Sequence, residues 1–140
     1  MGNQLIKNIN IEKESFLSGG VGVLWKLYKA QTTDKSKSPV VVFMYDKKMI
    51  FSLTPTAREE FLATLRREPY HLSQFKHERI TNLHTPLLED KKLVGFVTED
   101  FNTTLHGLLH ENKIEDIYST ELEAKMRIQM VAEVLKYLHD

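Results

Sequence analysis

Hydrophobic residues in the first part of the chain recur in the short runs that are typical of β-strands. Residues 23–28 alternate loosely between two faces, so Trp25 and Lys26 are expected on opposite sides of a sheet. Residues 40–45 are almost uniformly apolar, which is typical of a central strand buried on both faces. The polar residues 31–38 between these runs have the length of a hairpin connection.

A first strand is expected around Ile9, Ile11 and Phe16, before the glycine cluster, and a helix is predicted after the third strand. Thr54 is a capping residue and Pro55 stands at the first helical position. Pro69 has no amide N–H and restricts the residue before it, so we expect the helix to break or restart there. The apolar stripe of this helix consists of Phe61, Leu62 and Leu65.

Two further strands are predicted at residues 80–88 and 93–97, joined by the charged turn 89–92. The last segment has the clearest helical pattern, and Thr120 with Glu123 forms a capping box before it. This helix needs a partner surface for apolar residues that recur at three- and four-residue steps: Leu122, Met126, Met130, Val131, Val134, Leu135 and Leu138.

The composition narrows the class of protein. The 140 residues are 41% hydrophobic and suit one ordinary domain, while 19 basic and 19 acidic residues give no global field to attract nucleic acid. There are no cysteines, which excludes disulfides and thiolate zinc sites and fits a cytoplasmic location. No apolar stretch approaches the ~20 residues of a transmembrane helix. Gly2 stands in a myristoylation-like start, but Ile6 replaces the expected Ser or Thr.

The order of elements predicts an α+β fold with the organisation of a protein-kinase small lobe. That lobe is a five-stranded antiparallel sheet with an inserted helix, and the first helices of the large lobe follow it. We expect residues 1–101 to form the small lobe and residues 102–140 to begin the large lobe. The chain would then end before the catalytic loop, which supplies the catalytic aspartate and the metal ligands of kinases.

The glycine cluster supports this organisation in part. Kinases place glycines where a loop passes over the nucleotide phosphates. Gly19 and Gly22 match two of the three framework glycines, Leu17 stands at the first, and Leu24 takes the position that caps the adenine. A tight hairpin would also favour glycines here, so the cluster alone is a weak signal.

Phe43 is the most informative departure from an active kinase. It closes the strand at residues 39–43 where kinases have Val-Ala-Ile-Lys, and that lysine contacts phosphate and pairs with a helix glutamate. A phenyl ring can do neither. Val41 keeps its place in the expected nucleotide pocket. Glu68 is either the helix glutamate or an exposed residue at a helix junction, and the second interpretation is favoured.

Residues 97–101 resemble the segment that links the two lobes of a kinase. Thr98 would guard the back of the pocket, and Glu99 and Phe101 would offer main-chain groups to an adenine edge. Because these are main-chain roles, weak ATP binding is allowed, but no cofactor is predicted. A metal site is discounted, because His106 and His110 lack a third ligand in the expected pattern.

With these features in place, the chain resembles the SCY1-like pseudokinases, most closely the branch associated with clathrin-coated vesicles. The chain departs from that pattern at Glu78, where the family usually has proline. The resembling residues are Met1-Gly2-Asn3, Ser18-Gly19-Gly20, Gly22 with Trp25-Lys26, Val40 to Phe43 with Asp46-Lys47-Lys48, then Leu72, Phe75, His77, Arg79, His84-Thr85-Pro86-Leu87 and Thr98-Glu99.

The resemblance implies a catalytically inactive scaffold in clathrin-linked vesicle trafficking. Its partners would be clathrin or adaptor proteins, and its location cytoplasmic and peripheral at Golgi or endosomal membranes. In that family a helical-repeat region and a clathrin- or adaptor-binding tail follow the kinase-like domain. The alternative is a nucleotide-binding fragment of a serine/threonine kinase in which Lys26 replaces the lost strand lysine.

Overall fold

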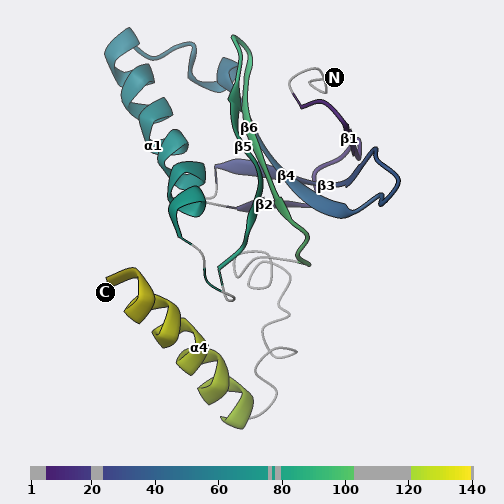
Figure 1. Ribbon diagram of the computed structural model, residues 1–140. Coiled ribbons are helices and arrows are strands. Elements are labelled where there is room, and N and C mark those ends of the chain that lie inside the picture. The colour runs from purple at the N-terminus through teal and green to yellow at the C-terminus, as the bar shows by residue number, and fades with distance from the viewer. Residues whose placement is uncertain (1–5, 20–23, 76, 78–79, 103–120, 140) are drawn as a thin grey trace.

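The computed structural model describes residues 6–19, 24–75, 77, 80–102 and 121–139 (Figure 1). It contains a six-stranded sheet, one long helix beside that sheet and a second long helix near the end of the chain. The strands are β1 (Ile9–Ile11), β2 (Leu17–Gly19), β3 (Trp25–Thr32), β4 (Pro39–Asp46), β5 (Leu83–Glu89) and β6 (Leu93–Glu99). The helices are the short 3-10 helix η2 (Lys47–Ile50), α1 (Pro55–Gln74) and α4 (Glu121–His139).

The sheet is antiparallel throughout, in the order β1-β3-β4-β6-β5, and β2 pairs with β3 outside this path. The apolar strand β4 lies in the middle, as its pattern predicts, with Val41, Val42 and Phe43 all buried. Val41 pairs with Lys29 of β3 and with Thr98 of β6. The register therefore brings the middle of β4 next to the start of the linker that follows β6.

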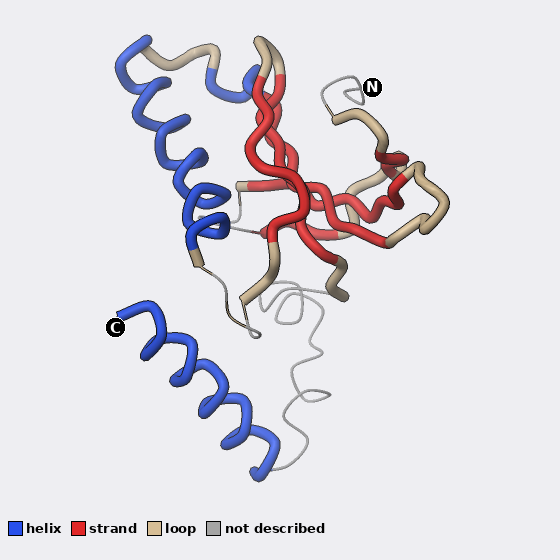
Figure 2. The backbone as a smooth tube through the Cα atoms, in the orientation of Figure 1, coloured by secondary structure: helices blue, strands red, loops and turns tan. Residues whose placement is uncertain are grey.

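The two faces of the sheet carry separate hydrophobic clusters. The face toward α1 is covered by Leu62 and Leu65 of that helix, which pack against Trp25, Phe43 and Phe96 of the sheet. The opposite face is closed by the N-terminal segment, because Ile6 and Ile9 pack there with Val40, Val42 and Val97. Figure 2 shows α1 running alongside one side of the strands. Burial of the whole α1 stripe holds the helix against the sheet.

The fold class is confirmed as an antiparallel α+β sheet with an inserted helix, but the number of strands differs. The pattern predicts five strands with the helix after the third, whereas the structure has six and places α1 after the fourth. The count differs because the first predicted strand, around Ile9, Ile11 and Phe16, is divided into β1 and β2. Both parts pair with β3, Ile9 with Thr32 and Leu17 with Leu27.

The helix break expected at Pro69 is wrong. Helix α1 continues from Pro55 to Gln74 with Pro69 inside it. Pro69 is buried on the same helix face as Leu62 and Leu65. Burial of this face against the sheet therefore outweighs the missing backbone hydrogen bond. The N-terminal signals are confirmed, since the Thr54 side chain accepts a hydrogen bond from the amide of Ala57.

Helix α4 extends over Glu121–His139 and leaves much of its apolar stripe exposed. Its contact with the rest of the molecule includes Tyr137, whose ring lies 6.1 Å from Phe75 and 5.1 Å from His77. The predicted cap residue Thr120 lies outside the described residues, as do the side chains of Leu122 and Glu123. Much of the predicted apolar stripe is exposed: Met126, Met130, Val131, Leu135 and Leu138 are all at least 38% exposed.

Candidate functional site

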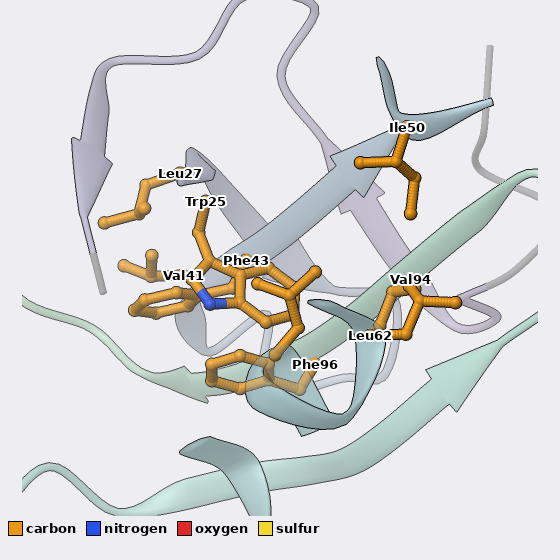
Figure 3. Close-up of a cluster of buried hydrophobic side chains, with 9 residues drawn as sticks. Trp25, Leu27, Val41, Phe43, Ile50, Leu62, Val94 and Phe96 are labelled. Carbon is orange, nitrogen blue, oxygen red and sulfur yellow. The ribbon is translucent and has the colours of Figure 1, made fainter. Parts of the chain in front are cut away.

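Aromatic rings from three strands meet around Phe43, the residue expected where a kinase has its lysine. Phe43 stacks on Phe96 with ring centroids 4.4 Å apart and an interplanar angle of 17°. Trp25 meets Phe96 edge-on at 4.9 Å and Phe43 at 6.3 Å (Figure 3). Trp25 and Phe96 are fully buried and Phe43 is 7% exposed. The offset and edge-on arrangements are those that aromatic pairs prefer.

Two further rings extend this group toward the linker after β6. Phe101 lies 6.1 Å from Phe43, and Phe16 lies 6.5 Å from Phe101. Both side chains are half-buried against the same cluster as Val41 and Leu27. We call Phe16, Trp25, Phe43, Phe96 and Phe101 the aromatic cluster. It fills the α1-side surface of the sheet with side chains that carry no charge.

Glu68 of α1 joins the aromatic cluster, contrary to the favoured expectation of an exposed residue at a helix junction. It is half-buried, and its Oε2 accepts a hydrogen bond of 2.9 Å from Trp25 Nε1. Because α1 continues through Pro69, the Glu68 side chain is directed at the sheet. Glu68 is therefore directed at the sheet, where it accepts a hydrogen bond from the indole N–H of Trp25.

Lys26 lies on the wrong side of the sheet to replace the missing lysine. It is exposed, pairs with Met44, and shares its strand face with Tyr28 and Ala30. Those residues pack in the cluster on the opposite face from Phe43. A side chain on that face would have to cross the sheet to reach the Phe43 position.

Lys29 is a site residue that the sequence pattern did not single out. It lies on the same face of β3 as Trp25 and Leu27, and its Nζ is 4.7 Å from the centroid of the Phe16 ring. The same ammonium group donates to the Phe101 carbonyl oxygen and pairs with Asp100 at 2.9 Å. Lys29 therefore ties β3 to the linker. The only sequence signal for this role is its spacing of four residues from Trp25 on one strand face.

The residues predicted to line a nucleotide pocket are only partly brought together. Val41 and Leu24 both belong to the α1-side packing, and Gly19 is buried where β2 pairs with Trp25. Gly22 lies outside the described residues, as do Gly2, His106 and His110. Thr98 is fully buried at the end of β6. The position of Thr98 next to Val41 follows directly from the β4–β6 register.

The main-chain groups expected to meet an adenine are engaged within the chain. The Glu99 carbonyl accepts a hydrogen bond of 3.0 Å from Thr98 Oγ1. The Glu99 amide donates to the Asn82 carbonyl at 2.9 Å, and the Phe101 carbonyl accepts from Lys29. Two of these interactions, Glu99 with Asn82 and Phe101 with Lys29, link segments that are distant in the sequence, whereas the Thr98 hydroxyl bonds its neighbour in the chain.

A charged network fastens the outer side of α1 to the edge of the sheet. Arg66 donates two hydrogen bonds of 2.8 Å to the Glu89 carboxylate and a third, of 2.6 Å, to Glu59. Lys47 also pairs with Glu89, at 2.7 Å. The Arg66 and Lys47 hydrogen bonds lower the pKa of Glu89 from its ordinary 4.5 to about 2, and the carboxylates raise the pKa of Arg66. This network is structural, because its charges are already paired.

Three cavities on the described surface are lined by residues outside the aromatic cluster. One of about 600 Å³ lies between α1 and β5, lined by residues that include Arg67, Tyr70 and Leu87. One of about 520 Å³ adjoins the start of α1, and one of about 550 Å³ lies beside β1 and Lys29. Within the described ranges no group of three His, Asp or Glu residues could hold a metal ion. The helices described there are too short or too polar to span a membrane.

The sheet, the inserted helix with an inward glutamate, and the linker after β6 define the small lobe of a protein kinase. The solved structure of Rad53 in complex with AMP-PNP supports this fold, with a TM-score of 0.65 at 18% identity. The match covers 95% of this chain and 30% of that one. At this identity the likeness concerns the fold alone.

The chain is homologous to SCY1-like protein 2. It is 28% identical to the proteins of that name from Homo sapiens and Mus musculus, over 99% of its own length. It spans only 16% of the length of those relatives. No family model matches the chain.

Proposed function

We propose that this chain is part of a catalytically inactive, kinase-like domain that acts as a protein-interaction scaffold. The observation that carries the proposal is Phe43, which stands at the position of the ATP-binding lysine and stacks on Phe96. A buried phenyl ring at this position supplies no positive charge for a phosphate group. Catalysis of phosphoryl transfer depends on such charges, which position the phosphates and stabilise the transition state. In this reading residues 1–101 are the small lobe and residues 102–140 begin the large lobe.

The pocket residues then form a degenerate nucleotide site that the chain closes with its own side chains. Leu24 and Val41 contribute apolar packing, while Thr98, Glu99 and Phe101 serve internal hydrogen bonds or ring contacts. Gly19 and Gly22 would be remnants of the phosphate loop. The Trp25–Glu68 hydrogen bond takes the structural place of the lysine–glutamate ion pair and holds α1 against the sheet without nucleotide.

The homology to SCY1-like protein 2 extends the proposal to a cellular setting. We assign the scaffold to clathrin-linked vesicle trafficking, peripheral to Golgi or endosomal membranes, with clathrin or adaptor proteins as partners. In fluorescence microscopy the tagged protein should coincide with clathrin at Golgi or endosomal membranes, and a location away from clathrin would remove this assignment. The proposal that the nucleotide site is closed is tested separately.

The test of the closed site is a thermal melt with and without Mg-ATP. A ligand present at ~100 times its dissociation constant stabilises a protein by about 2.7 kcal/mol, which is a readily measured shift in Tm. We expect no shift with millimolar Mg-ATP. A shift that depends on nucleotide concentration would favour the alternative of a nucleotide-binding kinase fragment. Lys26→Ala is the matched variant. If Mg-ATP shifts the Tm of the parent chain but not that of this variant, the phosphate contact belongs to Lys26.

A further inference from the structure

An exposed apolar loop precedes helix α1, at the end of the molecule remote from α4 (Figure 1). Met49 is 70% exposed, Phe51 56% and Leu53 38%. We call these three residues the apolar tip. The exposed apolar residues of α4 lie at the other end of the molecule, so the two sets are separate surfaces. Three large apolar side chains within five residues mark an interaction surface rather than scattered exposure.

The apolar tip is held in shape from below. Ile50, in the same loop, is only 4% exposed and anchors it in the α1-side core. The Arg58 guanidinium donates to the carbonyl oxygens of Phe51 at 3.2 Å and Leu53 at 3.1 Å. Its Cζ also lies 5.9 Å from the Phe51 ring centroid. Because backbone and ring are fixed in this way, the tip is presented outward and need not be ordered on binding.

Three lysines lie in η2 or in the turn beside it, next to the apolar tip in the fold. Lys48 belongs to η2, and the β5–β6 turn with Lys91 and Lys92 lies beside it, since the Lys47 amide donates to the Lys92 carbonyl at 2.8 Å. Lys48, Lys91 and Lys92 are exposed and form no ion pair among the described residues. We call these three residues the lysine rim.

The acidic groups near the lysine rim are committed to internal contacts. The Asp46 carboxylate accepts from the Lys48 amide at 3.0 Å, and the Asp90 carboxylate accepts from the amides of Lys92 and Leu93. Glu89 pairs with Arg66 and Lys47, as described above. Asp46 and Asp90 are exposed and keep their negative charge while they accept these hydrogen bonds, so the three lysines of the rim exceed these two carboxylates by one charge.

We infer that the apolar tip and the lysine rim form a docking surface for an anionic lipid membrane. Protruding apolar side chains enter the boundary between headgroups and acyl chains, while neighbouring lysines attract anionic headgroups. A protein partner would need a hollow that matches the protruding tip, whereas a bilayer accepts a protrusion of any outline. This surface shares no residue with the aromatic cluster, but the inference rests on the peripheral membrane location in the proposed function and supplies a surface for it.

The test is sedimentation of the whole chain with vesicles of phosphatidylcholine, alone or with about 30% phosphatidylserine. We expect binding to the mixed vesicles only, and weaker binding as salt is raised. The triple variant Lys48→Glu, Lys91→Glu, Lys92→Glu should bind at least about tenfold more weakly. Its matched control reverses three exposed lysines elsewhere, Lys7→Glu, Lys13→Glu and Lys35→Glu, and should bind as the parent does.

The apolar contribution has its own variants. Met49→Ser with Phe51→Ser should weaken binding, whereas Ile128→Ser with Val131→Ser on α4 should not. In a Phe51→Trp variant, indole fluorescence should shift to the blue when mixed vesicles are added, while the buried Trp25 contributes a constant background. No binding to mixed vesicles, or equal loss in the control variants, would overturn the inference. Each variant should melt at the same temperature as the parent chain, so that weaker binding reflects the surface and not unfolding. A protein partner that occupies the apolar tip in place of lipid would also contradict the inference.

Discussion

Replacing Trp25 by phenylalanine removes the indole N–H that reaches Glu68 while keeping an aromatic ring in the core. The donor is fully buried, and the hydrogen bond to the carboxylate is 2.9 Å long. A hydrogen bond to a charged group contributes about 1.5–3 kcal/mol, and half-burial of Glu68 lowers this to about 1–2 kcal/mol. The smaller ring also leaves a cavity, so the single variant should lose about 2–4 kcal/mol in total.

A double-mutant cycle separates the hydrogen bond from the cavity and from the other contacts of Glu68. The free energies of unfolding of Trp25→Phe, Glu68→Ala and the double variant would be measured by urea denaturation, followed by circular dichroism. We expect a coupling energy of about 1–2 kcal/mol. The control pairs Trp25→Phe with Glu59→Ala, which faces Arg66 instead, and should be additive. A Trp25–Glu68 coupling below about 0.5 kcal/mol would refute the claim that this bond holds α1 to the sheet.

Three further predictions concern the aromatic cluster and the charged network. Phe43→Ala should lower the free energy of unfolding, measured by urea denaturation, by about 3–5 kcal/mol. The reason is that it removes a stacked ring that is only 7% exposed. A loss below about 1 kcal/mol would contradict the packing described. Glu89 has a pKa lowered from 4.5 to about 2, so its contribution is present above pH 4.5 and is lost as pH falls toward 2. After allowance for solvent screening this amounts to about 1–2 kcal/mol, and Glu89→Gln should flatten the pH dependence of Tm in that window. Lys29→Met should cost only about 0.5–1 kcal/mol, less at high salt, since its side chain is 29% exposed; an equal loss at all salt concentrations would point to packing instead.

The sequence pattern predicts most of the sheet because its signals are local. The uninterrupted apolar run of β4 and the charged turn before β6 each depend on neighbours within a few residues. Phe43 is recognisable as a substitution for the same reason, since it ends a characteristic strand. Leu24, Val41 and Thr98 are placed by the same alignment of motifs.

Features that depend on contacts between residues distant in the sequence cannot be predicted from local patterns. Trp25 and Glu68 are 43 residues apart, and their contact requires α1 to run unbroken past Pro69. The local preference of proline predicts a break in the helix. The helix continues because burial of the face that carries Pro69 outweighs this preference. Lys29 meets Phe101 across 72 residues, so no local pattern identifies it as part of the site. Side chains that close a site from several elements become visible only in three dimensions.

The central claim, that the chain closes its nucleotide site with its own side chains, can be read from one signal. Trp25 is the single tryptophan of the chain, so its indole N–H gives one resonance from the centre of the aromatic cluster. Heteronuclear correlation spectra would be recorded during a titration with Mg-ATP into the millimolar range. We expect the indole resonance to stay in place throughout. A saturable shift of that resonance would contradict the account.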